Sequence, residues 1–378
     1  MNNSQILTCI YSPSTKNRLP FQTIMVYLLN PHHSGSHRAW ANGLARQLPD
    51  GCKKFTLPGR HWKWRMHGAA LHFADLLSSE SPPSAILATD MLDLATFKSL
   101  YRHQVPTLLY FHENQLTYPW SDRDQDPEMG RDRHYGWINM TSALAADAIA
   151  FNSSYHLQAF LDAIPKFLKA LPDFRPKQVV ERIGAKSCVI PIGFDFPDLP
   201  STHAQKTKET VLLWNHRWEY DKGPDEFLRL CQRLKERGVD FKLIVIGESA
   251  RNHPPAFNTL QTDFQNQIIH FGFVEEKERY WSLLSQATLQ PVTSKQDFFG
   301  MSVVEAQWAG VIPLLPNRLV FSERAASLPI LYNSFEELVE MVANPPNVSA
   351  QALRQIAQNF QWSTIIDQYR DWFHTSII

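Results

Sequence analysis

Two carboxylates, Asp297 and Glu305, stand eight residues apart in the segment DFFGMSVVEAQWAG. Gly300 and Met301 lie between them, just before the expected start of a helix at Ser302. A helix N-terminus presents free N–H groups and a partial positive charge, which suit a diphosphate. The flanking carboxylates can accept hydrogen bonds from sugar hydroxyls. A turn followed by an ordinary capped helix explains the same pattern, so both interpretations stay open.

Two cations, Arg217 and Lys222, occur in the segment WNHRWEYDKG, which follows an apolar run and precedes a helix pattern. An Arg fork and a Lys point charge can converge on one diphosphate. Two solvated surface cations are the alternative. The sequence has no GxxxxGK[ST] motif and no complete GxGxxG after its first apolar run, which argues against a P-loop and a dinucleotide oxidoreductase.

A third candidate, His112, follows the apolar run Thr107–Phe111 and precedes Glu113. Ligand contacts in an open α/β sheet lie at the carboxyl ends of the strands. A lone histidine is more often structural than functional, but this strand-end position favours function, so both interpretations stay open. Three other histidines cluster after the first apolar run: His32, His33 and His37. They lack an HExxH or Cys/His pattern, so we expect no metal site.

The elements that must position these residues alternate between short apolar runs and stretches of helical period. In the first half the expected strands are Ile24–Leu29, Ala85–Ala88, Thr107–Phe111, Ala148–Phe151 and Cys188–Ile192. In the second half they are Thr210–Trp214, Lys242–Ile246, Gln267–Phe271, Thr288–Val292 and Ile312–Leu315. Repeated βα units predict an α/β fold with two Rossmann-like, doubly wound domains facing a cleft.

Polar and proline-containing residues at Asp195–Lys208 separate the two halves and indicate a linker. A terminal helix is expected over 355–373, because Trp362, Ile366, Tyr369 and Phe373 share one face. The predicted boundaries are an extension at 1–22, domains at 23–196 and 209–354, a linker at 197–208 and a terminal helix at 355–378.

The composition excludes several classes of protein. The chain has 378 residues, 44% of them hydrophobic, and equal numbers of acidic and basic residues (37 each), so global disorder and a tail-driven nucleic-acid binder are excluded. Its four cysteines show no zinc spacing, and reduced thiols are expected. No apolar run approaches the roughly 18 residues of a membrane helix. These features predict a cytoplasmic protein without membrane association.

The second half resembles the nucleotide-sugar domain of glycosyltransferase family 4, a retaining family with the GT-B fold. Arg217 and Lys222-Gly223 match the family's Arg…Lys-Gly loop, and Asp297 and Glu305 match its E-x7-E motif, with Asp for the first Glu. Phe271–Val274 resembles the loop near the nucleotide base, and Val189–Asp195 the inter-domain strand. The terminal helix resembles the one that crosses back to the first domain.

The first half resembles the tRNA-queuosine mannosyltransferase group in segments such as LLNPHHSGSH, YFHENQLTYPW and DRHYGWINMTSALAADAIAFNSSYH. The resemblance implies transfer of mannose from GDP-mannose to queuosine in tRNA, with tRNA-Asp as the expected species, and no metal or other cofactor. The family's Gly-Gly after the first strand is Gly35-Ser36 here.

The resemblance also implies roles for individual residues. Arg217 and Lys222 would neutralise the leaving diphosphate, and His112 would contact the donor sugar near the reacting carbon. The remaining donor-binding residues would be Gly35, Ser36, Phe273, Val274, Asp297, Gly300, Met301 and Glu305. Asp297 would hold sugar hydroxyls and Glu305 the ribose. With no convincing covalent nucleophile, front-face transfer is preferred.

An RNA acceptor needs a basic surface with aromatic side chains. The segment Cys52–Ala74 predicts one, with the acceptor-binding candidates Lys53, Lys54, Arg60, Trp62, Lys63, Trp64 and Arg65. A second, mainly basic stretch holds Lys166, Lys169, Arg175, Lys177, Arg182 and Lys186 against the acidic Asp173 and Glu181. Solvated charge with core tryptophans is the alternative. A transferase acting on a small-molecule or lipid-linked glycan, and a non-catalytic sugar- or nucleotide-binding protein, are the rival functions.

Overall fold

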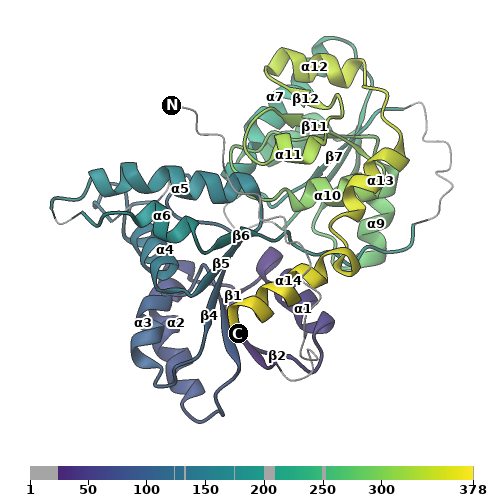
Figure 1. The fold of residues 1–378 in the computed structure, drawn as a ribbon. Coiled ribbons are helices and arrows are strands. Elements are labelled where there is room, and N and C mark those ends of the chain that lie inside the picture. Colours follow the sequence, from purple (N-terminus) through teal and green to yellow (C-terminus); the bar gives the residue numbers. More distant parts are fainter. Residues whose placement is uncertain are drawn as a thin grey trace.

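Two parallel sheets, each flanked by helices, make up the part of the chain that the computed structural model describes, residues 24–122, 124–131, 133–173, 175–199, 209–248 and 253–377 (Figure 1). The expected extension 1–22 lies outside this part, as do residues 200–208 of the expected linker. Each sheet has six strands, which confirms the predicted α/β class with two doubly wound domains.

The first sheet has the strand order β2-β1-β3-β4-β5-β6. Its strands are β1 (Val26–His33), β2 (Cys52–Pro58), β3 (Ala85–Thr89), β4 (Thr107–Phe111), β5 (Ala148–Phe151) and β6 (Ser187–Val189). Its helices are α1 (Gly35–Gln47), α2 (Trp62–Leu77), α3 (Leu94–Leu100), α4 (His134–Ala145), α5 (Ser154–Lys169) and α6 (Val179–Gly184). The order reverses between β1 and β3, where an open sheet binds its ligand.

The second sheet has the order β12-β11-β10-β7-β8-β9 and reverses between β7 and β10. Its strands are β7 (Val211–Asn215), β8 (Lys242–Ile246), β9 (Ile268–Gly272), β10 (Leu289–Pro291), β11 (Ile312–Pro316) and β12 (Leu331–Tyr332). Its helices are α7 (Pro224–Glu236), α8 (Ala256–Asp263), α9 (Lys277–Gln286), α10 (Met301–Trp308), α11 (Phe321–Ala325), α12 (Phe335–Ala343) and α13 (Ala350–Gln358), with a 3-10 turn at Tyr220–Lys222.

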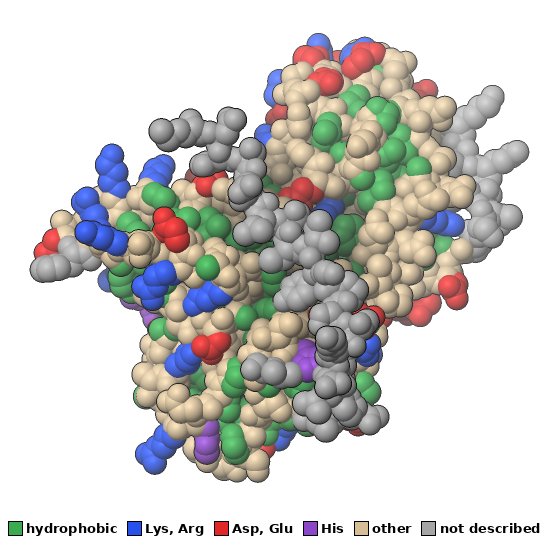
Figure 2. Space-filling view, in the orientation of Figure 1, with side chains coloured by type: hydrophobic (Ala, Val, Ile, Leu, Met, Phe, Trp, Pro, Cys, Tyr) green, Lys and Arg blue, Asp and Glu red, His purple; other side chains and the backbone are tan. Residues whose placement is uncertain are grey.

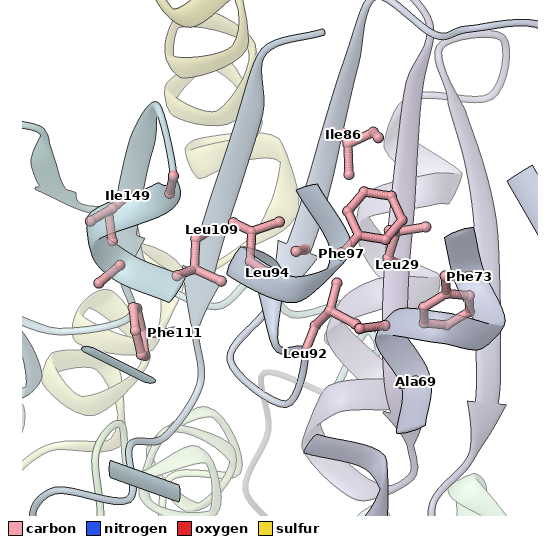
Figure 3. Packing of buried hydrophobic residues seen from close by; sticks show 14 of the residues in the cluster. Leu29, Ala69, Phe73, Ile86, Leu92, Leu94, Phe97, Leu109, Phe111 and Ile149 are labelled. Carbon is pink, nitrogen blue, oxygen red and sulfur yellow. The ribbon is translucent and has the colours of Figure 1, made fainter. Parts of the chain in front are cut away.

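Apolar residues of the first sheet form a core on each face, because strands covered on both sides are apolar throughout. On one face Leu29, Ile86 and Leu109 pack against Phe73 and Phe97 from the helices (Figure 3). On the other face Trp40 and Leu44 of α1 are fully buried, as the helical period predicts. These layers hold the carboxyl ends of the strands in place, where the candidate site residues lie.

All ten predicted strands are present, but two strands were missed. The edge strand β2 contains exposed Lys53 and Lys54, so its sequence does not read as a buried run. The strand β12 has only two residues. The prediction for β1 ended too early, since the strand continues through Asn30 to His33.

The prediction of one continuous terminal helix over 355–373 is wrong, because the structure has two helices there, α13 and α14 (Trp362–Ile377). The backbone between them bonds the inter-domain segment instead of continuing the helix: Phe194 N–H donates to the Phe360 carbonyl at 2.8 Å, and Trp362 N–H donates to the Phe194 carbonyl at 3.1 Å. The yellow helix α14 in Figure 1 then runs onto the first domain, where Tyr369 and Phe373 join its core. The predicted crossing is therefore confirmed.

Helices in the part of the chain that the structure describes are all too short or too polar to cross a membrane.

Candidate active site

Two adjoining cavities lie at the carboxyl ends of the two sheets. The smaller, about 250 Å³, is lined mainly by second-domain residues, and the larger, about 530 Å³, mainly by first-domain residues. Both are lined by Gly35, Ser36, Glu113, Tyr118, Arg217 and Glu248. Ligands in the two cavities would therefore share these six residues as contacts.

The two cations that line the smaller cavity, Arg217 and Lys222, lie in the turn after β7. The half-exposed Arg217 side chain lies 3.2 Å from the Glu219 carboxylate. Lys222 Nζ is largely buried, and it donates to the Gln296 carbonyl at 2.9 Å. Gly223 has φ +70°, and a Cβ there would stand 2.3 Å from the Thr293 carbonyl oxygen. Only glycine tolerates that conformation and that close approach, so Gly223 sets how near Lys222 comes to the loop after β10.

Asp297 bonds within its own loop and to Lys222. Its Oδ1 accepts from the N–H groups of Phe299 (3.0 Å) and Gly300 (2.6 Å), and its Oδ2 lies 3.3 Å from Lys222 Nζ. Burial would raise the pKa of Asp297, but Lys222 and these N–H groups outweigh it and lower that pKa. The short aspartate therefore shapes the turn before α10, a contact that its position in an E-x7-E pattern did not predict.

The buried Arg324 side chain also contacts this turn, and the sequence did not predict that contact. Its Nε donates to the Phe299 carbonyl at 2.6 Å, and its guanidinium lies 4.3 Å from the centre of the Phe299 ring. Burial lowers the pKa of Arg324 to about 10. Gly300 follows with φ +81° as the N-cap residue of α10, and the first turn of this helix lines the smaller cavity through Met301 and Ser302.

Glu305, one turn further along α10, also lines the smaller cavity. Its Oε2 accepts a 2.6 Å hydrogen bond from the Tyr280 hydroxyl. Burial raises the pKa of Glu305 to about 7, although this hydrogen bond opposes the shift. A carboxylate with further lone pairs facing a cavity is suited to accepting hydrogen bonds from hydroxyl groups.

A second buried histidine, His216, lines the smaller cavity and was missed from sequence. Its Nδ1 lies 2.9 Å from Ser302 Oγ in the first turn of α10, and its Nε2 has no hydrogen-bond partner among the described residues. Burial lowers its pKa to about 4, so the ring is neutral. The signal was its place directly after β7, beside Arg217.

The first-domain wall carries His112 at the end of β4. Its backbone N–H donates to Asp90 Oδ1 at 2.8 Å, and its ring lies 4.3 Å from that of His37 and 4.6 Å from that of Trp40. Neither ring nitrogen has a hydrogen-bond partner within the described part of the chain. Burial lowers the pKa of His112 to about 3, so the imidazole is neutral, and the residue lines the smaller cavity.

The N-terminus of α1 completes this wall. Gly35 has φ +46°, and with Ser36 it lines both cavities. The Ser34 N-cap side chain does not cap the helix, because its hydroxyl lies 3.3 Å from His32 Nδ1 instead. The first turn of α1 thus lacks a side-chain cap and lines the same cavities as Arg217, an arrangement suited to an anion.

Glu113 lies where the two cavities meet. Its Oε1 accepts from Gln115 Nε2 at 2.9 Å. Burial raises the pKa of Glu113 to about 7, with the Arg217 charge opposing the shift. A carboxyl group at this position can contact both ligands of a two-substrate reaction.

Contacts across the cleft join the two walls. The Tyr118 hydroxyl donates to Asp221 Oδ2 at 3.0 Å, and the Tyr220 hydroxyl donates to the Pro119 carbonyl at 2.7 Å. Ser153 Oγ donates to the Phe298 carbonyl at 2.6 Å. The loop that lines the larger cavity is therefore tied to the turn that carries Lys222.

Aromatic rings line the outer part of the larger cavity. Trp62, at the start of α2, and Trp120 both face it, with Arg60 and His61 beside them. The Trp62 ring lies 4.9 Å from that of Tyr135 and 6.4 Å from that of Trp120. Such rings provide flat faces on which a base can stack.

The other residues of the expected acceptor segment do not line either cavity. Lys53 and Lys54 lie near the amino end of β2, about 13 Å or more from its carboxyl end at 3.3 Å per residue, and they bond Glu80 and Asn42. Lys63 pairs with Asp124 (2.6 Å) and Asp126 (2.5 Å). Trp64 is 64% exposed, and Arg65 Nε donates to the Pro58 carbonyl. Of the seven acceptor-binding candidates in this segment, the structure thus places only Arg60 and Trp62 against the larger cavity.

Three donor-site candidates also lie outside the linings of the two cavities, and the first is Gly300, whose N–H donates to Asp297. Phe273, just after β9, is 64% exposed, and Val274 packs against an apolar cluster of the second domain. In the described ranges no group of three or more His, Cys, Asp or Glu side chains is placed to hold a metal ion.

Comparison with known proteins identifies this architecture. The structure superposes on sucrose-phosphate synthase of Thermosynechococcus elongatus (TM-score 0.72, 13% identity, 93% of this chain and 98% of that one). It also superposes on Anabaena HepE in complex with UDP (TM-score 0.67, 14% identity, 93% and 100%). At these identities the likeness shows the fold, which is that of GT-B enzymes. A family model for group 1 glycosyl transferases matches residues 195–326. The chain is a glycosyltransferase.

The first domain identifies the family more specifically. Residues 25–194 match the model of the tRNA-queuosine alpha-mannosyltransferase N-terminal domain. A tRNA-queuosine alpha-mannosyltransferase of Drosophila melanogaster is 32% identical over 372 residues, covering 93% of this chain and 97% of the relative. The chain belongs to the tRNA-queuosine alpha-mannosyltransferase family.

Proposed function

We propose that this protein transfers mannose from GDP-mannose to queuosine in tRNA, with tRNA-Asp as the natural acceptor. The observation that carries the proposal is the pair of adjoining cavities, one lined by cations and a helix N-terminus and the other by aromatic rings. The full-length similarity to a tRNA-queuosine alpha-mannosyltransferase supports the acceptor and the sugar. An acceptor of this kind would place the protein in the cytoplasm.

The smaller cavity has the chemistry of a nucleotide-sugar site. Arg217 and Lys222 would offset the charge that develops on the departing diphosphate, and the N-termini of α1 and α10 would face it from either side. Asp297 would hold Lys222 in place, with its remaining acceptor capacity facing the sugar. Glu305 would accept hydrogen bonds from the ribose hydroxyls.

The nucleotide of the proposed donor is GDP. A GDP-mannose:cellobiosyl-diphosphopolyprenol alpha-mannosyltransferase of Xanthomonas oryzae is 23% identical over 190 residues, 45% of this chain. A shared donor would account for a similarity confined to part of the chain, while the two acceptors differ.

The transfer step conserves the configuration at the anomeric carbon. The bond from the sugar C1 to the diphosphate oxygen breaks, and the acceptor hydroxyl oxygen bonds C1 on the same face. The acceptor proton passes to the departing phosphate oxygen. Neutral His112 would donate a hydrogen bond to the donor sugar near C1, because the residue lines the smaller cavity and neither of its ring nitrogens has a partner among the described residues.

The larger cavity would receive the modified base. Queuosine lies in a single-stranded loop of tRNA, where bases can be unstacked and bound by aromatic side chains. Trp62 and Trp120 would contact its rings, and Glu113 would lie beside the cyclopentenediol hydroxyl that accepts the sugar.

The direct test uses purified protein, GDP-mannose and two tRNA samples that differ only in carrying queuosine or guanosine at the modified position. We expect nucleoside mass spectrometry to show a gain of one hexose on queuosine alone, with UDP-glucose a poor donor. Transfer to a lipid-linked glycan, or none to the queuosine-containing tRNA, would contradict the proposal.

A further inference from the structure

A group of exposed cations lies at the far end of α5 and on the segment that follows it. Its members are Lys166 and Lys169 on α5, Arg175 and Lys177 in the connection, and Arg182 on α6. We call these five residues the α5–α6 basic patch. Figure 2 shows Lys and Arg side chains gathered over α5 and α6 on this face.

The cations of the patch are unlike Lys53, Lys63 and Lys98, each of which pairs with a carboxylate. None of its five cations forms an ion pair with the described acidic residues. Lys186, the sixth cation of this stretch, is excluded, because its side chain is only partly exposed and its Nζ donates to the Leu144 and Ala146 carbonyls. Arg175 is included, because it is exposed, although its guanidinium donates to the Leu171 carbonyl. Exposed cations without ion pairs repel one another and add no stability to the fold. A cluster of five also creates a positive potential that attracts an anionic partner.

The patch is connected to the larger cavity. The loop that contributes Trp120 and Asp124 to that cavity continues to Arg133, whose Nη1 donates to the Ala170 carbonyl just beyond α5. At its other end α5 begins at the cleft, where its N-cap Ser153 donates to the Phe298 carbonyl. With 16 residues at about 1.5 Å each, α5 is about 24 Å long, enough to pass several phosphates of an RNA strand.

We propose that the α5–α6 basic patch binds the phosphate backbone of the tRNA whose modified base enters the larger cavity. The proposal rests on the proposed function for its partner and adds where the rest of that partner lies. Phosphate contacts of this kind would supply affinity and orientation, while the cavity would supply selection of the base.

The test compares the triple variant Lys166→Ala, Lys169→Ala and Lys177→Ala with a matched triple on α7: Arg229→Ala, Arg233→Ala and Lys235→Ala. Both remove three exposed positive charges, but α7 lies on the second domain. The logarithm of tRNA affinity is measured against the logarithm of KCl concentration. We expect the slope to become shallower by roughly 2–3 in the α5–α6 variant, at 0.7–0.9 per phosphate contact, and to stay at the wild-type value in the α7 variant.

Kinetics and stability separate binding from structural effects. KM for tRNA should rise in the α5–α6 variant while kcat stays within about twofold. Lys166 and Lys169 also complement the dipole at the C-terminus of α5, and that role alone would lower Tm without moving the salt slope. Equal slopes in wild type and the α5–α6 variant would overturn the proposal.

Two further outcomes distinguish the possibilities. If the wild-type protein leaves queuosine-containing tRNA unmodified, the proposed function fails, whatever the slope. If phosphatidylserine vesicles bind the wild type but not the α5–α6 variant while the tRNA slopes agree, the patch binds a membrane surface and the inference is wrong.

Discussion

The two walls of the cleft differ in how their polar groups are held, although His216 Nε2 on the second-domain wall also lacks a partner among the described residues. On the second-domain wall, Lys222 bonds Asp221, Asp297 and Gln296, and Asp297 in turn bonds the N–H groups that begin the next turn. On the first-domain wall, both ring nitrogens of His112 lack a partner in the described structure, and Trp62 and Trp120 line open space.

The difference indicates a division of labour. Charges held by one another keep their positions when a diphosphate arrives, so the second-domain wall can stabilise developing charge without reorganising. Unpartnered groups are satisfied only by a ligand of the right shape, since a buried polar group left without a hydrogen bond is costly. We therefore expect donor chemistry on one wall and acceptor or sugar selection on the other.

The largest expected effect comes from removing the cations of the second-domain wall. Arg217→Ala and Lys222→Ala should each lower kcat roughly 10²–10³-fold, because each removes a charge that faces the departing diphosphate. The measurement is turnover with queuosine-containing tRNA, with Arg233→Ala as the control on an outer helix. Near-normal turnover in well-folded variants would place the diphosphate elsewhere.

The next effect concerns pH. The pKa of Glu305 is about 7 in the free protein, and ribose hydroxyls would be held by its charged form. Binding must then release a proton below that pH, so donor affinity should fall roughly tenfold per pH unit below about 7 and level off above it. Glu305→Gln should flatten this profile, measured by calorimetric titration with GDP-mannose. An unchanged profile in the variant would assign the titration to another group, with Glu113 the first to examine.

A third prediction contrasts two tryptophans of one helix. Trp62 lines the larger cavity, whereas Trp64 lies over Gly68 and is 64% exposed. Trp62→Ala should weaken tRNA binding by about 1–3 kcal/mol, the usual worth of a ring stacked on a base, and Trp64→Ala should not. Donor affinity and Tm are measured alongside. If Trp62→Ala binds tRNA as tightly as Trp64→Ala does, the larger cavity does not hold the base.

The smallest effect is expected from the contacts that join the walls. Tyr118→Phe and Tyr220→Phe each remove one hydrogen bond across the cleft, to Asp221 and to the Pro119 carbonyl. Each should lower the free energy of unfolding by about 1 kcal/mol. Hydrogen exchange should also increase in the loop that carries Pro119. Loss of several kcal/mol would show that the contact supports the fold rather than the cleft.

Much of the site could be predicted from sequence because its residues lie next to strand ends. Arg217, His112 and Asp297 each follow an apolar run, and parallel sheets bring such positions to one edge. His216 had the same signal and was overlooked beside Arg217. Arg324 had none, since it reaches the Phe299 carbonyl from a helix further along the chain.

The alternation of apolar runs and helical periods was sufficient to determine two doubly wound sheets, because burial on both faces demands it. Which cations are free to meet a polyanion was decided only by the tertiary structure. Lys63 and Lys166 look alike along the chain, but Asp124 and Asp126 reach Lys63 from a loop some sixty residues away. Ion pairing depends on distance in space, and no local pattern encodes which acidic side chain folding will bring within reach.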